Sequence, residues 1–594
     1  MKDERRHKII VGVDYGTTYT GASYVSTRGK GIDDIVLIKS WPGPARHSEV
    51  VLKSPSRIAY ASENGGKHRW GYQVEPGMTA YSWTKLLLDR GTPLTRYDSA
   101  LEDSARLGIF RLPEDKDAVQ VASDFLAGVY EHILKTIAKH ITEETLRITP
   151  LEFWFTVPAM WSDEAKNTTL EAARRGGFGS RGGSVEDKIC LIPEPEAAAI
   201  AVIRRSTTDG LGFSVKPGDG ILVCDCGGGT VDITTYLVKE VKPTLVFEEL
   251  CAGVGGKCGS TAIDRKFYHL MRSKFGKSFD NLPRKRTAPG SEFMNKFEII
   301  KRDFGYDSEE ITYELPLNMT LADADPKYFN EDERLVMISN DDLGPLFDPV
   351  MENILSLVRE QIEDANKQAG RKAINRIILV GGFGDSEYLR TAFRNAFSPA
   401  GNIAITVPNN AQAAIVQGAA LRGLEGLQAQ VRCCRRHYGF KKSQRFTNGV
   451  DDLDKSVIDK FDGKRLAPGY MKWMVEKGLK YPENYTHEVC IRAVHTRGDD
   501  LVFLSTLYTC DAGQAPNRVE HQDVHKVGEI TVDFRTTDLS VFRSRMRNGK
   551  LRYELKYSLK VIFVVQEGVL RFEACTNGRV IGKTSIEFAR EIYY

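Results

Sequence analysis

Two short stretches, far apart in the chain, repeat one arrangement of residues that could bind phosphate. Residues 10–18 read IVGVDYGTT, and residues 221–230 read ILVCDCGGGT. In each, an apolar run typical of a strand buried on both faces ends in an aspartate, followed by glycine and small or hydroxyl-bearing residues. Glycine allows a tight turn that brings backbone N–H groups close to a ligand, and hydroxyls add donors. Two such loops could hold a polyphosphate from both sides, with the aspartates organising Mg²⁺ because carboxylates repel phosphate.

Either stretch alone is also compatible with an ordinary strand and a glycine-rich turn, because short glycine motifs are weak signals. The recurrence of the arrangement, with Asp232 just after the second copy, favours the phosphate-binding interpretation.

Composition restricts the classes of partner. The chain has 594 residues, of which 41% are hydrophobic, and its 82 basic and 79 acidic residues leave a net charge of +3. This balance implies no general attraction to nucleic acid or to anionic membranes. The opening residues lack the apolar core of a signal peptide, and no apolar run is long enough to span a bilayer. The ten cysteines show no paired CxxC spacing, which disfavours zinc. We therefore expect a cytoplasmic protein.

Strand-like and helix-like patterns alternate over the first two-thirds of the chain. Strands are predicted at 9–13, 153–157, 189–192, 221–223 and 377–380. Apolar periodicity predicts helices over 121–141 and 350–362. Ser386 could cap a helix through 397, and Asn410 could cap another through about 424. This alternation predicts an α/β fold with mainly parallel sheets.

The pattern changes after residue 426. Residues 428–440 are polar and basic and are interpreted as a connector. Period-two alternation at 530–534 and 551–559 predicts strands, and 497–500 and 577–578 are interpreted as hairpin turns. We therefore expect one domain over 1–426 and a smaller β-rich domain, a sandwich, over 427–594.

Five segments resemble, in order, the motifs of the heat shock protein 70 chaperones, which belong to the actin-like ATPase superfamily. They are DYGTTY at 14–19, TVPA at 156–159, PEPEAAA at 193–199, DCGGGTVD at 225–232 and LVGG at 379–382. The resemblance implies a two-lobed actin-like ATPase fold over 1–426. Within the family, the chain is most similar to the divergent A12-type branch, which keeps the ATPase half and has a different C-terminal part.

The resemblance also implies roles for individual residues in binding ATP and Mg²⁺. The metal would be held through water by Asp14 and Asp232. The phosphates would be bound by Gly16, Thr17, Thr18, Tyr19, Gly227, Gly228 and Gly229. Catalysis would rest on Lys85, Glu194, Asp225 and Thr230. The remaining nucleotide contacts would come from a turn at Gly255 and Gly256, from Glu298, Lys301 and Arg302 on one helix face, and from Gly381, Gly382 and Phe383.

Three departures from the family pattern bear on function. Phe383, Gly384 and Asp385 stand where the family has a serine and then an arginine that helps to sandwich adenine, so nucleotide affinity or base preference is expected to differ. Gln412 replaces an acidic residue. The segment 423–430, GLEGLQAQ, lacks the family's acidic-leucine linker, which argues against stimulation by a J-domain co-chaperone.

The expected function is that of an ATPase of the heat shock protein 70 type. It would hydrolyse ATP slowly with Mg²⁺ and bind protein or peptide clients as a chaperone does. Two alternatives remain open. One is a nucleotide-binding adaptor with little hydrolysis, and the other is a small-molecule kinase of the same superfamily, for which we find no convincing substrate base.

Overall fold

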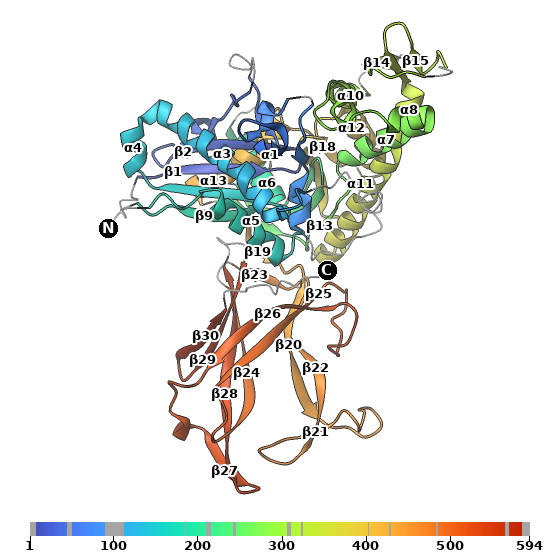
Figure 1. Ribbon diagram of the computed structural model, residues 1–594. Coiled ribbons are helices and arrows are strands. Elements are labelled where there is room, and N and C mark those ends of the chain that lie inside the picture. Colours follow the sequence, from blue (N-terminus) through green and yellow to red (C-terminus); the bar gives the residue numbers. More distant parts are fainter. Residues whose placement is uncertain are drawn as a thin grey trace. The chain divides into compact units, whose positions relative to one another are not determined.

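The computed structural model describes residues 7–43, 50–75, 77–89, 112–182, 185–208, 215–241, 245–305, 311–321, 325–401, 403–426, 429–482, 485–564 and 569–584. The chain divides into two compact units, Met1–Ala429 and Gln430–Tyr594. The first unit has the mixed α/β architecture expected of an actin-like ATPase, and the second is rich in β-strands (Figure 1). No helix in the described ranges has the length and apolar character needed to cross a membrane.

One sheet of the first unit carries the first phosphate-loop stretch. Its strands are β1 (Ile9–Tyr15), β2 (Tyr19–Ser26), β3 (Val36–Leu37), β4 (Lys53–Pro55), β8 (Leu151–Val157) and β9 (Lys188–Pro193). They follow the order β3-β2-β1-β8-β9, and β4 also pairs with β2. Every residue of β1 is buried, and β1 pairs antiparallel with β2 and parallel with β8. Burial on both faces explains the uninterrupted apolar run.

A second sheet repeats this local topology around the second stretch. Its strands are β10 (Gly220–Cys226), β11 (Val231–Glu240), β12 (Val246–Glu249), β13 (Val254–Gly256), β17 (Ile374–Val380) and β18 (Ala404–Thr406). The fully buried β10 pairs antiparallel with β11 and parallel with β17, as β1 does with β2 and β8. The five predicted strands are therefore confirmed, and the sequence repeat corresponds to a structural repeat.

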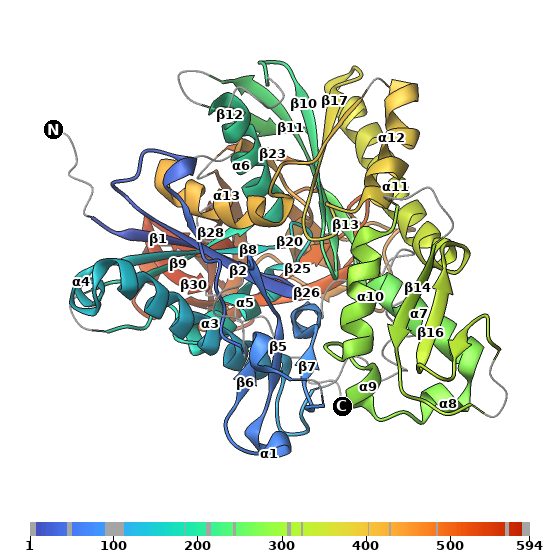
Figure 2. The ribbon, with the colours of Figure 1, turned by 90° about the horizontal axis from the view of Figure 1, so that it is seen from above.

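Two helices occupy the space between these sheets. Helix α6 (Glu194–Thr208) packs against β10 and β11, helix α13 (Ala411–Glu425) packs against β1, β2 and β8, and the two helices pack on each other. Figure 2 shows α6 and α13 between the two sheets. Ile10 of β1, Val223 of β10 and the alanines of α6 share one buried core. The start of each helix is thereby placed beside a phosphate loop.

The other helices cover the outer faces of the sheets and build two small additions. The helices are α1 (Ala61–Asn64), α3 (Ala118–Ile141), α4 (Glu143–Ile148), α5 (Asp163–Arg175), α7 (Thr261–Phe275), α8 (Lys277–Asp280), α9 (Arg284–Thr287), α10 (Glu292–Asp303), α11 (Asn340–Ala369) and α12 (Glu387–Gly401). The small sheets contain β5 (Arg57–Ala59), β6 (Arg69–Trp70) and β7 (Tyr81–Ser82), and β14 (Thr312–Pro316), β15 (Phe329–Asn330) and β16 (Leu335–Ser339). Helices α7, α10 and α11 bury their apolar faces in the core of the second sheet.

The close crossing of α6 and α13 depends on Gly418. A Cβ atom at Gly418 would lie 1.7 Å from the carbonyl oxygen of Ala197. We expect Gly418→Val to force the helices apart and to lower the free energy of unfolding by about 3 kcal/mol, which chemical denaturation can measure. Gly344→Ala on α11 is the control, because its Cβ would meet no atom within 4 Å. Equal destabilisation by both changes would contradict this account of the crossing.

The second unit is a β-sandwich. One sheet has the order β21-β22-β20-β25-β26, and the other has the order β24-β28-β29-β30 with β27 paired to β28. Their bounds are β20 (His437–Arg445), β21 (Val457–Ile458), β22 (Arg465–Val475), β24 (Thr486–Thr496), β25 (Val502–Cys510), β26 (Val524–Asp533), β27 (Arg543–Arg547), β28 (Lys550–Val564), β29 (Val569–Thr576) and β30 (Arg579–Thr584). Phe440, Val532, Leu559 and Phe572 belong to the core that the two sheets share. No α-helix occurs among the described residues of this unit.

Residues 428–440, interpreted as a connector, include the boundary between the two units at Ala429 and Gln430, but most of the run is strand. The segment forms β19 (Ala429–Cys433), which pairs with β23 (Lys480–Pro482), and the start of β20. Although the run is polar and basic, Cys433, His437 and Tyr438 are buried. The preference of residues such as Val431 and Tyr438 for strands therefore decides the local structure, in spite of the arginines in the run.

One of the two predicted hairpin turns is confirmed. Asn577 and Gly578 join the paired strands β29 and β30 with positive φ angles of 47° and 76°, as a two-residue hairpin turn requires. The turn at 497–500 instead joins β24 to β25, which lie in different sheets, so it is not a hairpin.

The two predicted helix caps also differ in outcome. The Ser386 hydroxyl accepts a hydrogen bond from the Leu389 N–H at 3.4 Å, which confirms this cap. Asn410 precedes α13 as expected, but its side chain makes no capping bond, and its backbone carbonyl accepts from Ala413 and Ala414 instead.

Candidate functional site

A cavity of about 310 Å³ lies between the two phosphate loops of the first unit. The predicted site residues that line it are Asp14, Gly16, Thr17, Thr18, Tyr19, Lys85, Glu194, Asp225, Gly227, Gly228, Gly229, Thr230, Arg302, Gly381 and Gly382. An adjoining cavity of about 190 Å³ shares Thr18, Gly228 and Gly382 with the first. Glu298, Lys301 and Phe383 line this second cavity. The structure thus brings residues from across the first unit to one cleft.

The two loops face each other directly. A Cβ atom at Gly228 would lie 2.2 Å from the Thr18 hydroxyl oxygen, and one at Gly229 would lie 2.5 Å from the Thr17 hydroxyl oxygen. Any side chain on these glycines would therefore collide with the opposite loop. The arrangement leaves backbone N–H groups and hydroxyls as the groups that a phosphate could meet from both sides.

Lys53 is a cleft residue that the sequence analysis missed. It comes from β4, which pairs with β2, and its Nζ lies 2.7 Å from Oδ2 of Asp14. Thr156 at the end of β8 donates to the other carboxylate oxygen of Asp14 at 2.8 Å. Burial opposes ionisation of Asp14, but the ammonium groups of Lys53 and Lys85 outweigh it and lower the pKa of this aspartate. Asp14 is therefore held as a carboxylate.

Lys85 and Glu194 form a buried ion pair in the cleft. Lys85 lies in a 3₁₀ turn (Thr84–Leu88), and its Nζ is 2.6 Å from Oε1 of Glu194, the first residue of α6. Both side chains are almost fully buried. Burial raises the pKa of Glu194 to about 7, although the Lys85 ammonium favours the ionised form. The carboxyl can therefore exchange a proton near neutral pH.

The chemistry of the carboxylates fits a hydrated Mg²⁺ ion. Asp225 and Asp232 are opposite one another on β10 and β11, and Oδ1 of Asp225 is buried without a hydrogen-bond partner. Burial, followed by the charges of Glu194 and Asp14, raises the pKa of Asp225 well above its usual range, so a cation there would be favourable. No group of three or more metal-ligating side chains occurs in the described parts of the chain. Mg²⁺ commonly keeps several waters and binds through few carboxylates plus phosphate oxygens, which matches this sparse set.

Three predicted residues line neither cavity. Asp232 is buried behind the second loop, where its Oδ1 accepts from the Met160 N–H at 3.4 Å. Gly255 of β13 pairs with Asp232, and Gly256 pairs with Val231. The roles proposed for these three residues in holding the metal and the nucleotide stay predictions.

One side of the cleft, where the nucleoside contacts were predicted, is built on α10. Lys301 Nζ lies 2.8 Å from Oδ1 of Asp264 and 2.6 Å from Oε2 of Glu298. Arg302 pairs with Glu298 at 3.0 Å, and its guanidinium carbon is 5.7 Å from the centre of the Tyr19 ring. The i, i+3 and i+4 spacing does place the three charged residues together, as expected. The guanidinium plane provides one surface on which a base could stack.

The loop after Gly382 and the start of α13, which line the same cavity, carry the residues that depart from the family pattern. Asp385 accepts a hydrogen bond from the Gln412 amide at 3.2 Å, so the two substituted positions contact each other. Burial raises the pKa of Asp385, with the Gln412 amide opposing the shift. Phe383 is buried in the core beneath the loop. Among the described residues that line this cavity, Arg302 is the only arginine. Stacking of a base on a guanidinium group would therefore depend on Arg302 alone.

The raised pKa of Glu194 implies that the stability of the fold depends on pH. Glu194 holds its proton in the native state up to about pH 7, whereas an unfolded glutamate loses its proton near its ordinary pKa of 4.5. The contribution of this group to stability is therefore full below pH 4.5 and is lost as the pH rises through about 7. Since glutamine does not titrate, we expect the Tm of Glu194→Gln minus the Tm of wild type to increase between pH 5 and pH 8 (roughly the window these pKa values span).

Calorimetry of the nucleotide-free protein measures this difference. Glu131→Gln on α3 is the control, because Glu131 is exposed and its pairing with Lys135 lies outside the cleft. A Tm difference that does not change with pH would contradict a native pKa near 7 for Glu194.

Comparison with known proteins identifies the family of this chain. A family model described as Hsp70 protein matches residues 112–429, more than half of the chain. Heat shock 70 kDa protein 12A of Mus musculus is 24% identical over 551 residues, which cover 78% of this chain and 76% of that protein. Heat shock 70 kDa protein 12B of Homo sapiens is 24% identical over 619 residues, which cover 89% of this chain and 84% of that protein. The chain therefore belongs to the heat shock protein 70 family, as a divergent A12-type member.

Proposed function

We propose that this protein binds ATP with Mg²⁺ in the cleft of its first unit and hydrolyses it slowly. The observation that carries the proposal is the opposition of the two loops, with Gly228 against Thr18 and Gly229 against Thr17. Hydroxyls and backbone donors that converge from two sides suit a chain of phosphates better than a single anion. Family membership supports the same ligand.

The roles of the side chains follow from their charges and positions. Bound Mg²⁺ would neutralise part of the phosphate charge and help to orient the phosphates. Lys85 would stabilise the charge that spreads over the transferring phosphoryl group. Glu194, whose pKa lies near 7, would position the attacking water and accept its proton. Lys53 would hold Asp14 ionised and oriented, since it pairs with Asp14 directly.

Single-turnover ATP hydrolysis by the purified full chain tests the proposal. Turnover is expected with Mg²⁺ and is expected to be lost with excess chelator. Asp14→Asn should lower turnover, whereas Asp34→Asn, on an exposed turn outside the cleft, should not. Failure to bind ATP with or without Mg²⁺ would reject the proposed function.

A second candidate is a nucleotide-binding adaptor that hydrolyses little ATP. It is favoured by Lys53, whose ammonium already neutralises Asp14, and by Asp385 in place of the adenine-facing arginine. This alternative predicts measurable ATP affinity together with turnover no higher than that of Lys85→Met.

For the second unit we propose binding of protein or peptide clients. The support is an edge strand, β21, and the loop before it, which expose Val450, Leu453, Val457 and Ile458. An exposed strand edge with apolar side chains can pair with an extended peptide. The absence of the family's acidic-leucine linker continues to argue against stimulation by a J-domain protein.

Fluorescence anisotropy with a labelled, extended apolar peptide tests client binding. Val457→Lys together with Ile458→Lys should weaken binding, whereas Val541→Lys, equally exposed but on a 3₁₀ turn (Leu539–Val541), should not. Equal binding by all three proteins would place clients elsewhere or exclude them.

A further inference from the structure

A second large cavity lies in the first unit, outside the nucleotide cleft. Its volume is about 700 Å³, within the range of pockets that hold small molecules. It is lined by the second half of α6, by α12, by the end of β18 with the segment 407–410 that follows it, and by the first turns of α13. None of its lining residues lines the nucleotide cavity, so the two sites are separate.

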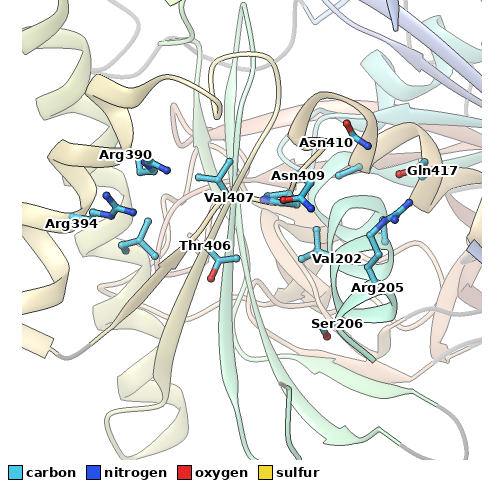
Figure 3. Close-up of a pocket in the computed structure, with 14 residues that line it drawn as sticks. Val202, Arg205, Ser206, Arg390, Arg394, Thr406, Val407, Asn409, Asn410 and Gln417 are labelled. Atoms are coloured by element: carbon cyan, nitrogen blue, oxygen red, sulfur yellow. The ribbon is translucent and has the colours of Figure 1, made fainter. Parts of the chain in front are cut away.

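The cavity is strongly basic. Arg390 and Arg394 come from α12, and Arg205 comes from α6. Figure 3 shows the two arginines of α12 on one side of the cavity and Arg205 on the other. No carboxylate belongs to its lining among the described residues. Two facing basic walls favour an anion with more than one charge.

Part of this hydrogen-bonding capacity is unused within the protein. Arg390 pairs with Glu387 through one terminal nitrogen, but its Nε is buried with no partner. Arg394 is exposed and makes no ion pair with a described residue. A buried guanidinium nitrogen without an acceptor costs free energy, and an anion in the cavity would remove that cost.

A buried amide adds a second kind of donor. Gln417 of α13 is only 5% exposed, lines the cavity and has no side-chain hydrogen bond to any described residue. It lies two turns from the start of α13, where Asn409 and Asn410 also face the cavity (Figure 3). The beginning of a fifteen-residue helix carries a partial positive charge that favours an anion. Arginine and amide donors therefore converge on the cavity.

The floor between the basic walls is apolar. Val202 and Val407 lie between Arg394 and Arg205 in Figure 3. Such a surface suits the carbon body of a ligand, while the charged walls suit its anionic groups. Donors that approach from several directions match the three oxygens of a phosphate better than the planar pair of a carboxylate.

We propose that this cavity is a second ligand site, which binds a small organic molecule that carries phosphate groups. The site does not depend on the proposed ATPase activity, because no residue of the nucleotide cleft contributes to it.

Inorganic pyrophosphate is the probe that tests the site. Calorimetric titration would use the full chain, with a non-hydrolysable ATP analogue present to occupy the cleft. We expect pyrophosphate to bind, and Arg394→Gln to weaken it about tenfold, the loss expected for one charge-assisted contact. Lys296→Gln on α10 removes one exposed charge outside the cavity and should leave the affinity unchanged.

The other arms of the experiment decide the ligand class. Arg205→Gln should weaken binding from the opposite wall, and because Arg394 is exposed, its variant keeps the test valid if Arg205→Gln fails to fold. Citrate that binds as tightly as pyrophosphate would overturn the preference for phosphate. Absence of pyrophosphate binding, or equal effects of Arg394→Gln and Lys296→Gln, would overturn the site itself.

Discussion

Lys85→Met is expected to lower single-turnover ATP hydrolysis by about 100-fold or more while leaving ATP affinity within about threefold of wild type. The reason is the position of the ammonium group in a buried site. Lys85 is 3% exposed, and its Nζ is 2.6 Å from Glu194. In such surroundings its charge acts strongly on a phosphoryl group whose negative charge redistributes during transfer. Binding, in contrast, is shared among many donors of both loops, so the loss of one cation affects it little.

Rapid-quench kinetics and equilibrium titration with an ATP analogue measure the two quantities separately. Lys8→Met is the matched control, because Lys8 also pairs with a glutamate, Glu152, but away from the cleft. Turnover that Lys85→Met leaves unchanged would reject the catalytic role of Lys85. A large loss of affinity with unchanged turnover at saturation would make Lys85 a binding residue instead.

Removal of Lys85 also leaves the Glu194 carboxyl buried without its cation. A lone buried charge is costly, so we expect Glu194 to remain protonated in the variant and the fold to lose some stability. The double variant Lys85→Met, Glu194→Gln carries no such charge. If the single variant is poorly folded, the double variant still tests whether the ion pair is needed for turnover.

The parts of the site that could be predicted from sequence are those encoded locally. Asp14 lies at the end of β1 and Thr17 and Thr18 follow it directly, and a buried strand with a glycine turn leaves few alternatives for their position. The same is true of Asp225 at the end of β10 and of Gly228 just after it. Because strand, loop and ligand-facing residues are contiguous, the chain pattern predicts both the elements and their local geometry.

Lys53 could not be predicted in this way. It lies in a three-residue strand with no motif, and it reaches Asp14 only because β4 pairs with β2. The contact joins residues 39 positions apart, so it depends on sheet register and not on local pattern. The cavity around Arg394 and Gln417 was missed for a similar reason, since three helices and a loop build it together.

Two features near the start of the second unit and within it were not predicted correctly, because composition does not specify burial or strand pairing. The polar and basic composition of 428–440 was interpreted as a connector, but the run forms strands in which residues such as Cys433 and His437 are buried. The turn at 497–500 has the composition of a hairpin, yet composition does not specify which strands pair. β24 pairs with β28, whereas β25 pairs with β20 and β26, so the two strands that this turn joins do not pair with each other.

Gly228→Val is expected to lower the affinity for ATP by about 100-fold or more. A Cβ atom at this position would lie 2.2 Å from the hydroxyl oxygen and 2.5 Å from the methyl carbon of Thr18. Threonine is short and β-branched, so its side chain has little freedom to move away. The new side chain would occupy the space between the loops, where the phosphates are proposed to lie.

Equilibrium titration with an ATP analogue measures the effect, and circular dichroism confirms that the fold is retained. The matched control is Gly382→Ala, which changes another glycine of the same cleft, but at a position where a Cβ would meet no protein atom within 4 Å. If the phosphates lie between the loops and only the nucleoside lies near Gly382, Gly382→Ala must lower the affinity for ATP much less than Gly228→Val does. Equal and small effects would mean that the loops do not enclose the phosphates. Equal and large effects would mean that the cleft tolerates no added volume anywhere, so that the opposition of Thr18 and Gly228 would lose its special role in binding.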